Sequence, residues 1–178
     1  MTELRAYWLL LCTGLLFACA SQPQPSVTAA PLPPSDITGW EVVGKAAVTG
    51  AEGSQTFNLR WSRLTLNEDR LRVSGPLGAG NTEIIRQGNT LLWRTGGQLL
   101  PISDLPDEDP VKILVEGVPL PLISSWLLGY PSASDQWQVQ TLEWQRVADW
   151  RVPKRLTASS NSISVKVFLQ QWQLEPAQ

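Results

Sequence analysis

Apolar and polar residues alternate along much of the chain, which is typical of β-strands with one buried face. The clearest alternation covers residues 57–62, in which Phe, Leu and Trp are separated by polar residues. Residues 71–74 and 163–167 repeat it. Weaker alternation predicts further strands at 41–49, 82–87, 90–95, 98–102, 137–147 and 168–174. Short stretches rich in Gly, Asn, Asp and Ser separate these segments, so the sequence predicts an antiparallel meander.

One central region has helical periodicity instead. Residues 111–118 place apolar side chains at i, i+3, i+4 and i+7, which predicts an amphipathic helix that Gly117 would end. The acids and proline of residues 107–110 suit its N-terminus. A second short helix is predicted for residues 122–128, before Gly129. Two helices inserted midway through a sheet would lie across one face, and an open barrel closed by a helical lid satisfies this arrangement.

The N-terminus resembles the signal of a bacterial lipoprotein. An apolar run from Tyr7 to Ala18 is too short to cross a ~30 Å hydrocarbon layer as a helix. It ends in Leu16-Phe17-Ala18-Cys19, which is similar to a lipobox. We therefore expect residues 1–18 to be removed as a signal peptide and Cys19 to be the lipid attachment site. The alternative is an ordinary secretory signal with an incidental cysteine.

Cysteine content and the following segment agree with this interpretation. Cys12 would leave with the signal, so the mature chain would hold a single Cys and no internal disulfide. A thioether-linked lipid would cap that thiol, and the several acyl chains of bacterial lipoproteins give a stable anchor. Residues 19–38 are rich in Pro, Ser and Ala, which predicts a flexible tether. Residues 39–178 would then form one folded domain.

Composition excludes several classes of function. The net charge is −2 without a long basic run, which argues against nucleic-acid binding. The absence of His removes the commonest general base and most zinc sites. The acids Asp104, Asp107, Glu108 and Asp109 could form a metal or acid–base site, but helix capping is preferred because nothing else completes a site. We expect no catalytic residue, no metal and no cofactor.

The loop at residues 75–80 combines two breakers with an apolar tip. Pro76 ends the preceding strand because it cannot donate to a ladder, and Gly78 and Gly80 permit an unusual turn. Leu77 lies between them. Its side chain either covers the edge of the core or projects as a small apolar probe for a membrane or acyl chain.

In these features the chain resembles the LolB family of outer-membrane lipoprotein receptors. The resemblance covers roughly residues 40–174. Its motifs are Gly44-Lys45-Ala46-Ala47, Phe57 with Trp61, Pro76-Leu77-Gly78 with Glu83, residues 117–122, residues 126–131, Val152-Pro153 and the strand at 163–172.

The resemblance implies an incomplete, unclosed antiparallel β-barrel with short helices over one opening and an apolar cavity for acyl chains. It implies a monomer, anchored in the outer membrane and facing the periplasm. Such a protein accepts lipoproteins from the periplasmic carrier LolA and places them in the membrane. Pro76, Leu77 and Gly78 match the family's membrane-delivery loop. Alternation alone suggests the residues that face the cavity: Phe57, Leu59, Trp61, Leu71, Val73, Leu114 and Trp126.

The chain departs from the family in having no longer helical segment before the first strand and in being shortened before Val152, so a smaller lid and cavity are expected. The rival hypothesis is a lipid-anchored β-domain that binds protein partners of the cell envelope. It needs no cavity, so a filled barrel interior would favour it.

Overall fold

The computed structural model describes residues 30–34, 37–51, 53–76, 80–107, 109, 111–131 and 136–175. The predicted signal peptide of residues 1–18, the lipid site Cys19, the tether up to residue 29, and Leu77 and Gly78 of the predicted delivery loop lie outside these ranges.

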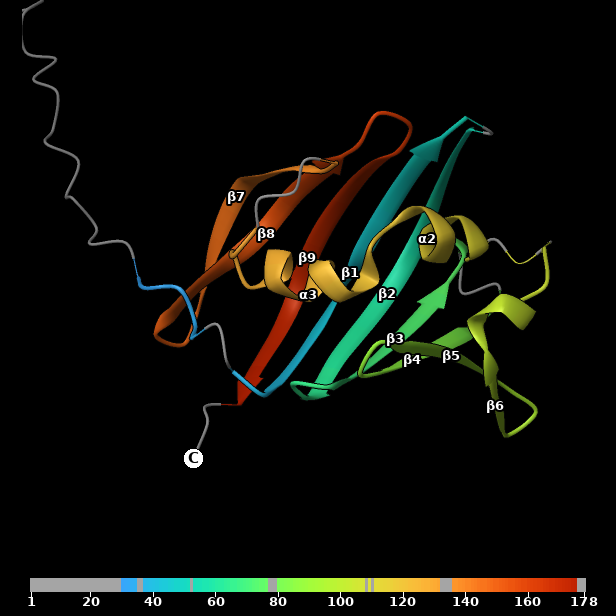
Figure 1. The fold of residues 1–178 in the computed structure, drawn as a ribbon. Helices are drawn as coiled ribbons and strands as arrows, with labels where there is room; N and C mark the ends of the chain where they lie inside the picture. Colours follow the sequence, from blue (N-terminus) through green and yellow to red (C-terminus); the bar gives the residue numbers. More distant parts are fainter. Residues whose placement is uncertain are drawn as a thin grey trace, which may run out of the picture.

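Nine antiparallel strands form one sheet that curls around a central space (Figure 1). Their order is β6-β5-β4-β3-β2-β1-β9-β8-β7, so β6 and β7 are edges and the barrel is not closed. This confirms the predicted mainly β fold. The strands are β1 Gly39–Gly50, β2 Gly53–Thr65, β3 Glu68–Ser74, β4 Thr82–Gln87, β5 Thr90–Thr95, β6 Gln98–Pro101, β7 Gln138–Val147, β8 Trp150–Ser159 and β9 Ser164–Glu175.

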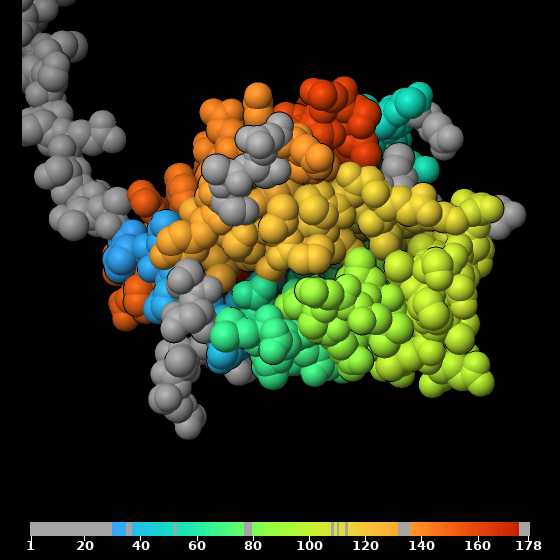
Figure 2. All heavy atoms as spheres, in the orientation of Figure 1, coloured from blue at the N-terminus to red at the C-terminus, as the bar shows by residue number. Residues whose placement is uncertain are grey.

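Two short helices cover the concave face of the sheet. They are α2 Lys112–Gly117 and α3 Leu120–Leu127, and a 3-10 turn, η3 Ile102–Asp104, precedes them. In Figure 2 they form a band of side chains between the two halves of the curled sheet. Both helices were predicted, although α3 begins two residues early because Pro121 fits its first turn. None of the helices in the described part of the chain is long and apolar enough to cross a membrane.

Two features of the sheet were not predicted. Strand β8 was missed because Val152 and Pro153 are both buried, which breaks its alternation. Strand β9 is one strand, although the pattern indicated two. Its apolar Phe168 faces outwards under the guanidinium of Arg155, 5.7 Å from the ring centre, so three apolar residues follow one another. Both exceptions are local packing arrangements that period-two alternation does not encode.

The described part of the N-terminal segment is packed against the domain. The Arg151 N–H donates to the Pro31 carbonyl oxygen at 2.8 Å, and the Tyr130 hydroxyl donates to the Pro33 carbonyl oxygen at 2.9 Å. The Ile37 side chain is buried in the core. Pro31, Pro33 and Ile37 therefore contact the folded domain, and the tether over residues 19–38 stays a prediction.

Candidate functional site

The interior beneath α2 and α3 is lined by apolar residues only. Strands β1, β2, β3 and β9 supply one wall and the two helices supply the other. The lining residues are Ala46, Phe57, Leu59, Trp61, Leu71, Val73, Leu114, Leu120, Ile123, Leu127, Val165 and Val167. The space that they leave is about 20 Å³. Because one water needs about 10–15 Å³ by this measure, the interior is essentially filled in this conformation.

Six of the seven residues predicted to face the cavity line this space, namely Phe57, Leu59, Trp61, Leu71, Val73 and Leu114. The seventh, Trp126, is buried but packs against Trp137, with ring centres 5.7 Å apart. The prediction omitted Ala46, Val165, Val167, Leu120, Ile123 and Leu127. Alternation in β1 and β9 and the i, i+3, i+7 spacing on α3 carried the signal for them. That these residues bind acyl chains remains a prediction.

Among the described residues of α2 and α3, the side-chain hydrogen bonds and ion pairs run to residues of the same helix or just before it. Ser124 Oγ donates to the Pro121 carbonyl oxygen at 3.1 Å, and Ser125 Oγ donates to that of Leu122 at 2.7 Å. Lys112 pairs with Asp107 and with Glu116. In the described part of the chain, no hydrogen bond or ion pair is found between α2 or α3 and a strand. Apolar packing therefore holds the helices against the sheet.

Two of the acids before α2, Asp107 and Asp109, contact the N-terminal end of this helix. Asp109 accepts the Val111 N–H at 2.9 Å and the Thr82 hydroxyl at 3.0 Å, which fits the capping interpretation. The hydrogen bond and charge of Lys112 hold the pKa of Asp107 below its ordinary value. Among the described residues there is no group of three or more Cys, Asp or Glu placed to hold a metal ion.

Three tryptophans gather at one end of the interior. The ring centres of Trp40 and Trp61 are 6.3 Å apart, and those of Trp40 and Trp172 are 5.7 Å apart. All three side chains are buried, and their indole N–H groups have no hydrogen-bond partner among the described residues. An unpaired buried donor costs roughly 1–3 kcal/mol.

A buried ion network continues the inner face beyond the tryptophans. Arg63 Nε and Arg86 Nε lie 3.0 and 2.8 Å from the two carboxylate oxygens of Asp69. The Arg63 guanidinium also lies over the Trp40 ring, 5.4 Å from its centre. Sequence patterning did not reveal this network, because an alternating strand assigns Arg63 and Asp69 to the apolar face.

The outer face of β2 and β3 carries a second, open depression of about 320 Å³. We call it the arginine groove. It is lined by Trp40, Glu41, Arg60, Ser62, Arg63, Leu64, Arg70, Arg72 and Gln173. Arg60 and Ser62 contact Glu41. This site was missed, although Arg60, Arg70 and Arg72 stand in the polar positions of the alternating strands, with Arg63 reaching it from an inner-face position.

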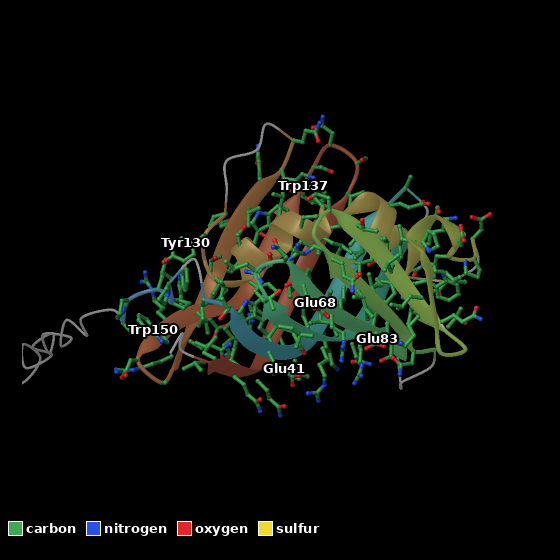
Figure 3. All side chains as sticks on the ribbon, turned by 60° about the horizontal axis from the view of Figure 1, so that its bottom comes forward. Glu41, Glu68, Glu83, Tyr130, Trp137 and Trp150 are labelled. Atoms are coloured by element: carbon green, nitrogen blue, oxygen red, sulfur yellow. The ribbon has the colours of Figure 1, made fainter. Side chains whose placement is uncertain are left out.

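Glu83 joins three arginines beside the groove. The Nε atoms of Arg94, Arg72 and Arg70 lie 2.7, 3.2 and 3.4 Å from its carboxylate oxygens. Burial alone would raise the pKa of Glu83, but the hydrogen bonds from Arg94 and Arg72 and the nearby charges hold it below its ordinary value. Figure 3 shows Glu41 and Glu83 along the same lower margin of the sheet. The acids there leave an excess of guanidinium groups facing solvent.

Of the predicted delivery loop, the structure describes Pro76, which is exposed directly after β3. The Gly75 carbonyl oxygen accepts a hydrogen bond from Asn58 Nδ2 at 3.0 Å, which fixes the start of the loop against β2. The loop therefore leaves the sheet at the end of β3 that lies farthest from the β2–β3 turn.

Comparison with known proteins gives consistent matches. The sequence profile of the family described as "Outer membrane lipoprotein LolB" matches residues 38–172. The chain is 26% identical over 195 residues to the outer-membrane lipoprotein LolB of Chromohalobacter salexigens, covering 94% of this chain and 90% of that one. The LolB of Tolumonas auensis is 23% identical over 201 residues, covering 98% and 99%.

Two solved structures also show some similarity. One is a LolA superfamily protein from Nitrosomonas europaea, with a TM-score of 0.44 and 6% identity over 80% of this chain and 88% of that chain. The other is a putative outer membrane lipoprotein-sorting protein domain from Vibrio parahaemolyticus, with a TM-score of 0.46 and 6% identity over 79% and 86%.

Proposed function

Because this chain belongs to the LolB family of outer membrane lipoproteins, we propose that it accepts lipoproteins from a LolA-like periplasmic carrier and inserts them into the outer membrane. The observation that carries the proposal is the interior beneath α2 and α3, whose twelve lining residues are all apolar. Each acyl CH₂ buried there contributes about 0.8 kcal/mol, so one chain contributes on the order of 10 kcal/mol.

Binding requires the helices to move, because ligand pockets generally measure ~300–1,000 Å³ and this interior offers about 20 Å³. The lid suits such a movement. Leu114, Ile123 and Leu127 contact the sheet through apolar side chains only. An acyl chain that replaces them restores apolar contact. Opening therefore exchanges one kind of apolar burial for another.

The tryptophan cluster supplies donors for the polar part of the cargo. Diacylated lipids carry ester carbonyl oxygens at the head of their acyl chains. Trp61 lines the apolar interior, and its buried indole N–H has no partner within the described part of the chain. In the proposed complex this N–H donates to an ester carbonyl, which compensates a donor that the closed form leaves unpaired.

Delivery of the bound lipoprotein to the membrane is the second step of the proposed function. Cys19 carries the lipid that anchors the protein in the outer membrane, with the domain in the periplasm and residues 76–78 as the loop that touches the bilayer. The chain acts as a monomer without a cofactor, and it catalyses no covalent chemistry. Acyl chains have a lower free energy in the bilayer than in a protein cavity, so transfer from this protein to the membrane is favourable.

The rival function, a lipid-anchored domain that binds protein partners, is favoured by one observation. The interior is filled in this conformation, and a domain without lipid cargo needs no cavity. The two functions differ in whether acyl chains ever enter.

A transfer assay tests the proposal. Carrier loaded with a lipoprotein whose acyl chain bears a photoreactive group is mixed with this chain and illuminated. We expect crosslinks to the inner faces of β2 and β3 and to α3, followed by appearance of the lipoprotein in added vesicles. Crosslinks confined to the outer surface, or cargo that stays on the carrier, would support the rival. Depletion in the host gives a second readout, in which outer-membrane lipoproteins accumulate on the carrier.

Leu77→Glu separates binding from delivery. We expect the variant to take cargo from the carrier at the wild-type level but to release it into vesicles several-fold more slowly. Leu142→Glu, a change at an exposed leucine on β7, is the matched control and is expected to deliver normally. Loss of folding in the Leu77 variant would show instead that this leucine belongs to the core.

A further inference from the structure

The turn between β2 and β3 exposes two leucines. Leu64 falls in a break of the β2–β3 register between Arg63 and Thr65, and 46% of its surface is exposed. Leu66 occupies the turn itself, where Gly, Asn, Asp or Ser is usual, and is 49% exposed. Two large apolar side chains at the tip of a hairpin cost solvation free energy unless something covers them.

Hydrogen bonds hold the tip in this exposed position. Arg86 donates to the carbonyl oxygens of Leu66 and Gly88 at 3.0 and 2.9 Å, and the Gly88 N–H donates to the Asn67 carbonyl oxygen at 2.8 Å. Arg86 is itself fixed by buried Asp69. The leucines therefore project from an ordered turn, and the buried ion network supports it.

Basic side chains lie directly beside the leucines. Leu64 forms part of the wall of the arginine groove, together with Arg60, Arg70 and Arg72. The Arg60 and Arg72 side chains are about half exposed, and Glu41 is the acid in the lining of the groove. Apolar side chains flanked by arginines match the two layers of a bilayer surface, acyl chains below and phosphate groups above.

The chain enters the domain at the same end of the sheet. Trp40 at the start of β1 pairs with Arg63, and Arg151 at the start of β8 binds Pro31. In Figure 1 the start of β1, the end of β9 and the β2–β3 turn lie together at the lower end of the sheet. Ten residues lie between Cys19 and Ala30, and the eleven residue steps limit the distance between anchor and domain to roughly 40 Å.

We propose that Leu64, Leu66 and the arginine groove form a membrane-docking edge, in which the leucines enter the bilayer surface and the groove holds a phospholipid headgroup phosphate. This rests on the proposed function in so far as Cys19 anchors the chain. Strand β3, roughly 20 Å long, separates this edge from Pro76. Docking by this edge therefore holds the predicted delivery loop away from the bilayer, and the tether is long enough for the domain to turn over and deliver.

A depth probe tests the docking edge. The full lipid-anchored protein carrying Leu66→Cys is labelled with a polarity-sensitive fluorophore and reconstituted into phosphatidylcholine vesicles with or without phosphatidylglycerol. We expect a blue-shifted emission that nitroxide-labelled lipids quench, more strongly with phosphatidylglycerol. The same label on Leu142→Cys, at the exposed face of β7, should stay water-exposed. Equal exposure of the two labels would overturn the proposal.

Charge variants in the Leu66→Cys background test the groove. Arg60→Gln and Arg72→Gln should each lower the docking equilibrium about five-fold at low salt, since a basic residue near an anionic surface contributes about 1 kcal/mol. Lys166→Gln, on the exposed face of β9, is the matched control and should change it little. Unchanged docking in both arginine variants would overturn the role of the groove.

Two further measurements distinguish the docking edge from a simple anion site and from the proposed function. If inorganic phosphate binds the groove while the Leu66 label remains in water, the groove is an anion site and not a docking edge, and the proposal fails. Cargo uptake from the carrier is measured on the same variants and should be at the wild-type level, because none of the substituted residues lines the apolar interior. Uptake without docking refutes the docking edge alone, whereas docking without uptake refutes the proposed function.

Discussion

The inner and outer faces of β2 and β3 differ more than their shared backbone suggests. Leu59, Trp61 and Leu71 point into a closed apolar space of about 20 Å³. Their neighbours along the strands, Arg60 and Arg72 among them, line an open groove of about 320 Å³ on the other side. A two-residue period therefore gives one pair of strands two surfaces, one suited to acyl chains and the other to anionic groups.

The comparison has one exception, at the end of the strands near the β2–β3 turn. There Arg63, Asp69 and Arg86 occupy inner-face positions, although all three are charged. Asp69 pairs with both arginines, and Arg63 also covers Trp40. The network ends the apolar interior and supports the exposed turn, so it couples the two surfaces.

Breaking this network should have the largest effect. Asp69→Asn removes the carboxylate that neutralises two nearly buried guanidinium groups, and the loss of one partner of a buried ion pair typically costs ~3–5 kcal/mol. We expect a loss of that size in the free energy of unfolding, measured with urea, and an increased mobility of the Leu66 turn. The control Glu83→Gln should cost under about 1 kcal/mol. Similar losses in both variants would show that the buried network stabilises the protein no more than the exposed ion pairs of Glu83 do.

Truncating a side chain of the lid tests whether the interior opens to admit an acyl chain. Ile123→Ala on α3 removes a buried side chain that lines the interior and should lower the free energy of unfolding by ~2–4 kcal/mol. The same change enlarges the cavity, so cargo uptake from the carrier should be faster although the protein is less stable. Leu122→Ala, at a more exposed position of the same helix, is the control for both measurements. Slower uptake in the Ile123 variant would argue against a lid that opens.

Much of this inner face could be predicted from sequence, because alternation in β2 and β3 is regular. Six of the seven predicted residues line the interior, five of them on β2 and β3 and Leu114 on α2. The failure at Trp126 is informative. Its position on α3 is buried, but the helix turns that side chain towards Trp137, a contact between residues eleven positions apart that spacing alone does not reveal.

The arginine groove and the buried network could not be predicted for a different reason. An alternating strand assigns polar residues to solvent, and Arg60 and Arg72 fit that assignment until the curl of the sheet brings them beside Leu64 and Gln173. Asp69 and Arg63 contradict the assignment outright, because both are charged and buried, and they pair with each other. Such pairings depend on strand register, and a single sequence does not specify register.

Removing an indole N–H should have a moderate effect on ligand preference. It separates the hydrogen bond of the N–H from the packing of the aromatic ring. Trp61→Phe keeps an aromatic ring in the apolar interior and deletes the donor. If the N–H binds an ester carbonyl, the wild type should prefer a diacyl ligand over its dialkyl ether analogue by ~2–10-fold, the equivalent of one hydrogen bond, and the variant should lose this preference. Trp137→Phe, next to Trp126 and outside the lining of the interior, is the control. A preference that persists in Trp61→Phe would exclude this role for the residue.

The smallest effect concerns the outer face and depends on pH. Arg94 and Arg72 hold the pKa of Glu83 below its ordinary value despite its partial burial. A carboxylate with a depressed pKa in the folded state stabilises the protein above its unfolded pKa, about 4.3, and that contribution is lost as the pH falls through the folded value.

The stabilisation should stay under about 1 kcal/mol, because solvent screens partners that are one-third to one-half exposed. The free energy of unfolding of wild type minus that of Glu83→Gln should therefore be positive near neutral pH and vanish in acid, and it should shrink with added salt. A difference that is independent of pH would mean that Glu83 acts through packing, and the outer face would then differ from the inner face less than its charges indicate.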